Sequence, residues 1–330
     1  MKNEQPQRCR WSTRRHRQGL LAATVTLALL AAACGSDKDS TASPAVTTAN
    51  STAVTEVMAD TTTAAAGPAG IEFNQALHDS LPKDILDKGV LTLATDPTDP
   101  PLEFYNESNE LVGAEVDLAN ALAIVFGIKV EMVPSKFDAI IPGIEAGRFD
   151  GSLSGFADRV ERQKVVDFVD FFTSSRGYLI QTGKFPELAD ATDLCGHAVA
   201  VAKGTTMADA IQGLSDTCVA DGKDAIDGQI YPDQSACVLA VQSGRADLTI
   251  LSDHAALAIA QSSDGALDVI LRPNEGQDIN GLVLRKDDLA EPMQTAIQGL
   301  MDSGALLDIF TTWNLQELML TTATVNAGVN

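Results

Sequence analysis

Basic residues are scarce in this 330-residue chain, which has 23 Lys and Arg against 45 Asp and Glu and a formal net charge of −22. A surface that binds nucleic acid needs clustered basic side chains to neutralise phosphates. Adsorption to anionic lipid depends on the same side chains. The shortage therefore argues against nucleic acid as a partner, and it means that any attachment to a membrane has to be covalent.

Motifs of common enzyme and cofactor sites are also missing. The chain has no Gly-rich phosphate loop and no HExxH, and the stretch 151–155, which comes nearest to a nucleophile elbow, has Leu153 at its centre. The four histidines are scattered along the sequence. We therefore expect no catalytic residue, no cofactor and no bound metal ion.

One hydrophobic run stands out near the N-terminus. Residues 20–33 are apolar or small apart from two threonines, follow an Arg-rich stretch and end at Cys34. Fourteen residues span about 21 Å as a helix, which is short for a bilayer core of roughly 30 Å. The pattern predicts a secretory signal peptide over residues 1–33. The small residues before Cys34 resemble a bacterial lipobox, so we expect this cysteine to be lipidated; the alternative is an ordinary signal peptide that happens to contain a cysteine.

The segment after Cys34 is rich in Ser, Thr and Ala and has no aromatic residue. Such a segment cannot bury enough apolar surface to fold. We expect residues 34–72 to be the lipidated cysteine and a flexible tether, whose root-mean-square reach would be about 30–36 Å. The remaining chain is long enough for two lobes with separate cores.

Three cysteines remain beyond the N-terminal region, namely Cys195, Cys218 and Cys237. In an exported protein this number suggests one disulfide and one free thiol. We favour a Cys195–Cys218 bond, which would contribute about 3 kcal/mol to stability, and the role of Cys237 stays open. Zinc binding by Cys195, His197 and Cys218 is the alternative, but no paired CxxC or HxxxH spacing supports it.

From Val90 onward, the apolar pattern predicts strands alternating with helices. The first unit has strands at 90–94, 129–133, 151–154 and 177–181 and helices at 116–126 and 137–146. The second has strands at 198–202, 229–231, 248–251 and 267–271 and helices at 204–214, 233–243 and 253–261. A strand at 281–284 and helices at 287–301 and 306–313 follow. This alternation predicts α/β lobes with largely parallel sheets.

Candidate binding residues follow the ends of these strands, where α/β sheets bind ligands. They are Asp96, Asp99, Phe137, Ser154, Gly155, Arg162, Thr205, Thr206, Ser252 and Asp253. The N–H groups and hydroxyls of residues 204–206 would lie at a helix N-terminus, which suits a carboxylate. Arg162 would add a bidentate contact.

The order of these motifs resembles the family 3 extracellular solute-binding proteins of ATP-driven importers, best known for polar amino acids. The resemblance covers about residues 90–313. It rests on Ala94–Pro101, Val112–Ala119, Phe137–Ile144, Glu161-Arg162 before Val166–Phe168, Lys203–Thr206, Gly244–Asp247 and Trp313.

The resemblance implies a two-lobed α/β fold of the type II periplasmic-binding-protein kind, with hinge crossover strands at 177–181 and 281–284. Lobe 1 would comprise residues 73–183 and 275–330, and lobe 2 residues 184–274. The lobes would close on the ligand by a hinge motion. The chain, expected to be a monomer, would then deliver the ligand to an ABC permease outside the cytoplasm, where the lipid anchor holds it at the cell membrane.

The resemblance also implies roles for single residues. Arg162 would bind the ligand α-carboxylate, assisted by residues 154–155 of the same lobe and by Thr206 of the other. Phe137 would pack on the ligand side chain, and Asp96 would lie near its distal polar groups.

Three positions depart from the family pattern. Asp99 stands where an aromatic residue is usual, Ala157 replaces a hydroxyl-bearing residue, and Ser252 replaces the acid that holds the α-amino group. Asp253 comes next, and whether Ser252 or Asp253 faces the ligand stays open, because a one-residue slip reverses the direction of a strand side chain. We therefore expect a cationic or modified amine-bearing acid as ligand, with Asp96 and Asp99 as countercharge.

Two other functions fit the same fold. A dehydratase-like enzyme would need a poised carboxylic acid, for which Asp96, Asp99 and Glu103 are candidates. The second function is that of a protein that binds a ligand and presents it to a separate sensor. A self-contained sensor is not expected, because no second hydrophobic span follows Ala33.

Overall fold

The computed structural model describes residues 70–184, 191–272, 276–286 and 288–329. The predicted signal peptide, Cys34 and the predicted tether up to residue 69 lie outside the described residues. No helix in the described ranges combines the length and the apolar character needed to cross a bilayer.

The first lobe is organised by a six-stranded sheet made from two separate parts of the chain. Its strands, from one edge to the other, are β14 (Met319–Val325), β7 (Val166–Ser174), β13 (Asp278–Arg285), β6 (Gly151–Ser152), β1 (Val90–Thr95) and β5 (Lys129–Pro134). β1 pairs in parallel with β5 and β6, whereas β13 and β14 run antiparallel to β7. The sheet is therefore mixed.

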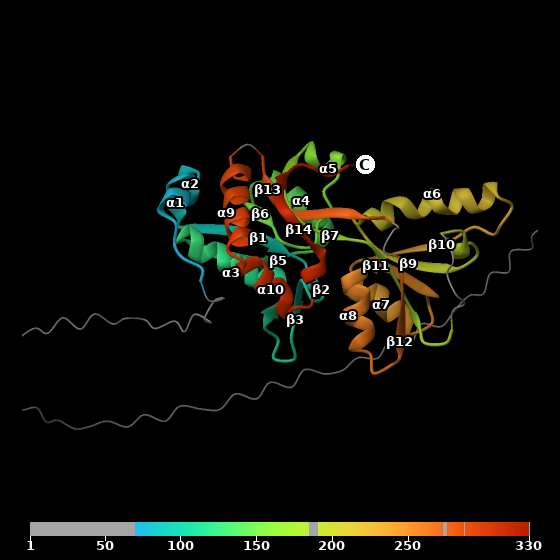
Figure 1. Ribbon diagram of the computed structural model, residues 1–330. Helices are drawn as coiled ribbons and strands as arrows, with labels where there is room; N and C mark the ends of the chain where they lie inside the picture. Colours follow the sequence, from blue (N-terminus) through green and yellow to red (C-terminus); the bar gives the residue numbers. More distant parts are fainter. Residues whose placement is uncertain (1–69, 185–190, 273–275, 287, 330) are drawn as a thin grey trace, which may run out of the picture. The chain divides into compact units, whose positions relative to one another are not determined.

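Helices cover both faces of this sheet (Figure 1). The helices are α1 (Gln75–Asp79), α2 (Lys83–Lys88), α3 (Ala114–Phe126), α4 (Phe137–Glu145), α5 (Val160–Gln163), α9 (Ala290–Asp302) and α10 (Ala305–Thr312). Because successive strand residues point to opposite faces, Leu93 of β1 packs in the core formed with α3, α9 and α10. Its neighbour Ala94 packs in the smaller core under α4.

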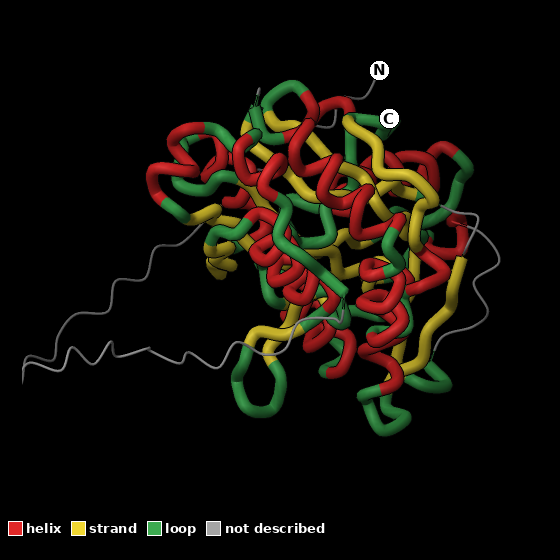
Figure 2. Tube along the Cα trace, turned by 60° about the vertical axis from the view of Figure 1, so that its left-hand side comes forward, coloured by secondary structure: helices red, strands yellow, loops and turns green. Residues whose placement is uncertain are grey.

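The second lobe contains a five-stranded sheet in the order β10 (Asp227–Tyr231), β9 (Ala198–Ala202), β11 (Leu248–Ser252), β8 (Arg176–Gln181) and β12 (Leu267–Arg272). Tyr178 and Ile180 of β8 pack in the core that includes α6 (Thr206–Ala220). Leu179 packs on the other face, with α7 (Gln234–Gln242) and α8 (Asp253–Gln261). Figure 2, with helices in red and strands in yellow, shows the same layering of helices on strands.

The boundary between the lobes lies at a different residue from the one predicted. The crossover strand predicted at 177–181 belongs to the second sheet, where β8 pairs antiparallel with β11 and β12. The first part of lobe 1 therefore ends near Ser175, not at residue 183. Only that serine separates β7 from β8, and both strands are equally apolar, so the sequence carries no sign of where the sheet changes.

Several strands were not predicted. β7 and β14 are missing from the expected set, as is a small sheet of β2 (Thr98–Asp99), β3 (Glu103–Tyr105) and β4 (Leu111–Val112). Strands of two or three residues are too short to show alternation. This small sheet nevertheless matters, because it carries Asp99 and Glu103 beside the ligand cavity.

The predicted disulfide is confirmed. Cys195 and Cys218 are bonded, and they tie the end of a short 3-10 turn (Ala191–Leu194) to α6. Cys237 is a buried free thiol on α7, and burial raises its pKa to about 12. At neutral pH it is therefore a packed, unreactive side chain.

Candidate functional site

A cavity of about 90 Å³ lies between the two lobes. Nearly all of the predicted ligand-binding residues line it: Asp96, Asp99, Phe137, Ser154, Gly155, Arg162, Thr205, Thr206 and Ser252. The strand-end rule and the family motifs therefore point to one place in the fold. Asp253 is the exception, and it is not part of the cavity lining.

Arg162 lies at the centre of this site. From α5 it donates through Nη1 to the carbonyl of Ala157 at 2.8 Å and through Nη2 to the carbonyl of Gly204, in the second lobe, at 3.1 Å. Its guanidinium carbon lies 5.8 Å from the Phe137 ring centre and 5.2 Å from that of Phe156. Burial lowers the pKa of Arg162 to about 10, so the side chain stays charged at neutral pH.

Asp96 connects the end of β1 to the start of α4. Its Oδ2 accepts the N–H of Phe137 at 2.9 Å, and its own N–H donates to Ser154 Oγ at 2.8 Å. Burial raises the pKa of Asp96 above its ordinary value. The strand end, the first helical residue and Ser154 are thus fixed relative to one another.

Asp99 is packed against the backbone at Gly155. Gly155 has φ +57°, and a Cβ there would lie 2.6 Å from Asp99 Oδ2. A larger residue at 155 would push the carboxylate away. Asp99 is itself buried, and its Oδ1 lies 3.7 Å from Nε2 of His254, which belongs to the second lobe.

His254 joins carboxylates from both lobes. Its Nδ1 is 3.5 Å from Asp253 Oδ1, and its Nε2 is 3.1 Å from Ser252 Oγ. Burial by itself would lower the pKa of His254, but the carboxylates of Asp253 and Asp99 outweigh it and raise the pKa to about 9. A buried imidazolium therefore bridges the lobes at neutral pH.

Ser252 and Asp253 lie in different surroundings at the start of α8. Ser252 is the last residue of β11 and lines the cavity, whereas Asp253 is the first residue of the helix. Asp253 Oδ2 accepts the hydroxyl of Ser175, at the crossover between the sheets, at 2.5 Å. Asp253 is therefore not part of the cavity lining, because its carboxylate contacts His254 and Ser175.

Two buried glutamates belong to the cavity region: Glu103 lines the cavity, and Glu115 lies behind it. Glu103 Oε1 accepts the hydroxyl of Ser154 at 3.0 Å, and Glu115 Oε2 accepts the N–H of Gly155 at 3.0 Å. Burial, with the neighbouring carboxylates of Glu115 and Asp99, holds the pKa of Glu103 well above its ordinary value. Burial also raises the pKa of Glu115 to about 7. Both shifts favour the protonated, uncharged form of these two side chains.

The beginning of α6 closes the cavity from the second lobe. Thr205 caps this helix, accepting the N–H of Ala208 at 3.2 Å. Gly204, just before it, has φ +80°, and a Cβ there would lie 2.9 Å from the Cβ of Asp138 on α4 of the first lobe. The two lobes are therefore in close contact at this glycine.

Two ion pairs join the lobes around the cavity. Lys203 Nζ lies 2.7 Å from Asp138 Oδ2, and Lys136 Nζ lies 2.6 Å from Asp233 Oδ2. Asp233 also caps α7, accepting the N–H of Ala236 at 2.9 Å. Together with Arg162, these contacts describe a closed arrangement of the lobes.

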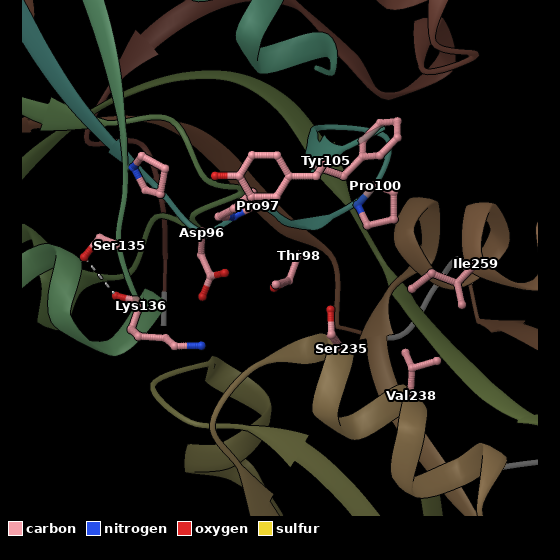
Figure 3. A pocket seen from close by; sticks show the side chains of 12 residues that line it. Asp96, Pro97, Thr98, Pro100, Tyr105, Ser135, Lys136, Ser235, Val238 and Ile259 are labelled. Atoms are coloured by element: carbon pink, nitrogen blue, oxygen red, sulfur yellow. Dashed lines mark hydrogen bonds between the residues drawn. The ribbon is translucent and has the colours of Figure 1, made fainter. Parts of the chain in front are cut away.

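A larger groove of about 790 Å³ adjoins the cavity (Figure 3). Its walls come from both lobes: Asp96, Pro97, Thr98, Pro100, Phe104, Tyr105, Pro134, Ser135, Lys136, Ser235, Val238 and Ile259. In neither space did we find metal ligands: the described residues contain no cluster of three or more His, Cys, Asp or Glu side chains placed to bind a metal ion.

Comparison with known proteins identifies the family. Residues 91–316 match the bacterial extracellular solute-binding proteins, family 3. The chain belongs to this family. The Arginine-binding protein ArgT of Corynebacterium glutamicum is 30% identical over 248 residues, which is 74% of this chain and 81% of that protein. The L-cystine-binding protein TcyJ of Escherichia coli K12 is 25% identical over 74% of this chain and 90% of its own.

Solved structures agree with the family assignment. An ancestral arginine-binding protein bound to arginine has a TM-score of 0.62 and 28% identity, covering 68% of this chain and 98% of that one. An ancestral amino acid-binding protein, described as a precursor of cyclohexadienyl dehydratase, has a TM-score of 0.60 and 27% identity, covering 70% and 97%. The predicted two-lobed α/β fold is confirmed, and the named relatives of this chain are binding proteins.

Proposed function

We propose that this chain captures a cationic amino acid, or a related amine-bearing acid, between its lobes and delivers it to an ABC permease. The observation that carries the proposal is the charge of the cavity. Its lining includes Asp96, Asp99, Asp233 and Asp278, while Arg162 is the one Lys or Arg among the lining residues. Asp233 is paired with Lys136 and Asp278 with Arg159. This leaves Asp96 and Asp99 as the countercharge for a ligand that brings more positive than negative charge.

The arrangement assigns a place to each end of such a ligand. The ligand carboxylate would meet Arg162 and the positive N-terminal end of α6 at residues 205–206. The ammonium group of the ligand would lie toward the carboxylate of Asp99 on the first lobe. This carboxylate is also in contact with His254 of the second lobe. The relatives named for arginine support a cationic ligand.

The anchoring of the protein is part of the same proposal. Residues 1–33 would be removed on export, and Cys34 would carry the lipid that holds a monomeric binding body near the permease. The extracellular character of the family supports this location. Labelling of the native chain with palmitate tests the anchor; label incorporation is expected, and its persistence in Cys34→Ser would contradict it.

Calorimetry on the folded chain without its lipid tests the ligand. We expect arginine and ornithine to bind, glutamine to bind more weakly, and Asp99→Asn to weaken the cationic ligands by about tenfold or more, since each bond to a charged group contributes about 1.5–3 kcal/mol. Asp216→Asn, at an exposed position on α6, is the matched control. Tight binding of uncharged or acidic ligands only, unaffected by Asp99→Asn, would overturn the proposal.

A dehydratase-like enzyme is the second candidate, and one observation favours it. Glu103 lines the cavity, and burial with the neighbouring carboxylates holds its pKa well above its ordinary value, which favours the protonated acid that such an elimination needs. Incubation with prephenate, followed by absorbance of the aromatic product, tests this function. Turnover that Glu103→Gln abolishes would support it, whereas absence of turnover in a protein that binds amino acids leaves binding as the function.

A further inference from the structure

The ligand space has two compartments that meet at one boundary. The inner cavity of about 90 Å³ and the outer groove of about 790 Å³ share Asp96 and Thr98. Figure 3 shows both side chains pointing into the space between the lobes. The ion pair between Lys136 and Asp233 marks the same boundary, because Lys136 lines the groove and Asp233 lines the cavity.

The inner compartment is too small for a whole amino acid with a long side chain. An engineered cavity of roughly 150 Å³ in another protein holds one benzene ring, about six carbon atoms. On that scale, the 90 Å³ cavity holds about four heavy atoms, close to the five of an ammonium, Cα and carboxylate, and it leaves no room for a long side chain. In the closed arrangement, the rest of a larger ligand therefore has to extend from the cavity into the groove, past Asp96 and Thr98.

The outer compartment differs in chemistry from the inner one. Its apolar side chains come from the first lobe at Pro97, Pro100, Phe104, Tyr105 and Pro134 and from the second lobe at Val238 and Ile259. Figure 3 shows Tyr105 and Pro100 on one side of the groove and Val238 and Ile259 on the opposite side. Its volume lies within the roughly 300–1,000 Å³ that is typical of small-molecule sites.

We propose that the natural ligand is bipartite, with an amino-acid head in the inner cavity and a bulky, mainly apolar or aromatic tail in the outer groove. The inference rests on the proposed function, because the head is placed by the same residues. It goes further by naming a class of ligand, namely an amino acid whose side chain is extended by an apolar group. The tail passes between Asp96 and Thr98, where a polar linker finds hydrogen-bond partners.

A matched pair of ligands separates head from tail. Nε-acetyl-L-lysine and Nε-benzyloxycarbonyl-L-lysine have the same head and the same uncharged Nε, and they differ in the apolar group that would occupy the groove. Calorimetry with the folded chain is expected to show at least tenfold tighter binding of the benzyl derivative. L-alanine serves as the reference for the head alone, and L-arginine as the reference for the proposed function.

Variants on one helix test whether the groove causes the preference. Val238 of α7 lines the groove, and its neighbour Leu239 is exposed and does not. We expect Val238→Asp to reduce the ratio between the two lysine derivatives to about one, and Leu239→Asp to preserve it. The same comparison on α8 uses Ile259→Asp against the exposed Leu257→Asp.

The outcomes distinguish the inference from the function beneath it. Equal affinity for the two lysine derivatives, with arginine still bound and lost in Arg162→Gln, overturns the bipartite ligand and leaves the proposed function in place. A ratio that persists in Val238→Asp and Ile259→Asp also overturns it. Failure of arginine and both derivatives to bind the native protein overturns the proposed function and the inference together.

Discussion

The two lobes build the cavity from different parts of their structure. The first lobe contributes charged side chains at strand ends and on short elements, among them Asp96, Asp99 and Arg162. The second contributes the beginnings of helices, with residues 205–206 at the start of α6 and Ser252 directly before α8. The difference indicates that charge selection is concentrated in the first lobe, whereas the second completes the site when it closes. Each prediction below tests this division.

Removing the cationic anchor of the first lobe is expected to have the largest effect. Arg162→Gln should weaken ligand binding by roughly 100-fold or more, because two charge-assisted hydrogen bonds of about 1.5–3 kcal/mol each are lost. Calorimetry measures the change. Arg148→Gln is the control, since Arg148 is exposed on the same lobe. A loss of only a few-fold in Arg162→Gln would show that the second lobe holds the carboxylate instead.

Blocking closure without removing any charge comes next. Gly204→Ala places a Cβ 2.9 Å from that of Asp138 across the lobes, so we expect about tenfold weaker binding from overpacking. Gly222→Ala is a matched control, because Gly222 has a similar φ of +72° and no atom within 4 Å of an added Cβ. Both variants carry the same backbone strain, so equal effects on affinity would contradict the contact at Gly204.

The contact between His254 and Asp99 across the lobes is expected to make ligand binding depend on pH. The pKa of His254 is raised to about 9 by Asp253 of its own lobe and by Asp99 of the other. The share that Asp99 contributes favours closure at low pH, and this gain is lost as pH rises through 9. We expect affinity to fall by about tenfold between pH 6.5 and 9.5, since one pKa unit corresponds to a factor of ten. His254→Gln should flatten this part of the profile. An unchanged slope in that variant would assign the titration to the ligand.

The ion pair at the rim should matter least. Lys203 and Asp138 lie 2.7 Å apart, but the Lys203 side chain is 65% exposed, and exposed pairs are screened by solvent and salt. Lys203→Gln should weaken binding by about twofold at low salt and less at high salt, measured by calorimetry. Lys83→Gln, which breaks a pair within the first lobe, should leave affinity unchanged. A tenfold effect of Lys203→Gln would assign a direct ligand contact to the second lobe.

Much of the chain could be predicted where local pattern and structure coincide. The helix expected at residues 253–261 is present at those positions, because an acidic first residue and apolar spacing both specify it. β2 to β4 could not be found in this way, since their two or three residues carry no periodicity. The division between β7 and β8 was hidden for a different reason, as no change in composition accompanies the change of sheet.

Prediction of the site residues from the sequence has the same limit. Strand-end positions such as Asp96 and Ser154 could be predicted because topology brings them together, and the role of Arg162 was assigned through the family resemblance. Glu115 and His254 could not, because their roles arise from partners distant in sequence. In the sequence, Glu115 resembles an ordinary first-turn acid and His254 an isolated histidine. Burial in the folded protein raises the pKa of Glu115, and the carboxylates of Asp253 and Asp99 raise that of His254.

The construction of the first sheet from two parts of the chain has a consequence for the order of folding. β7 has β13 on one side and β14 on the other, and both are synthesised after the whole second lobe. Until residues 278–325 have emerged, the strand that carries Phe171 and Phe172 has two open edges and lacks α9 and α10 over one face, a state in which strands aggregate. The second lobe is one uninterrupted stretch and can complete its sheet earlier. The half of the protein that selects charge is therefore the last to be finished.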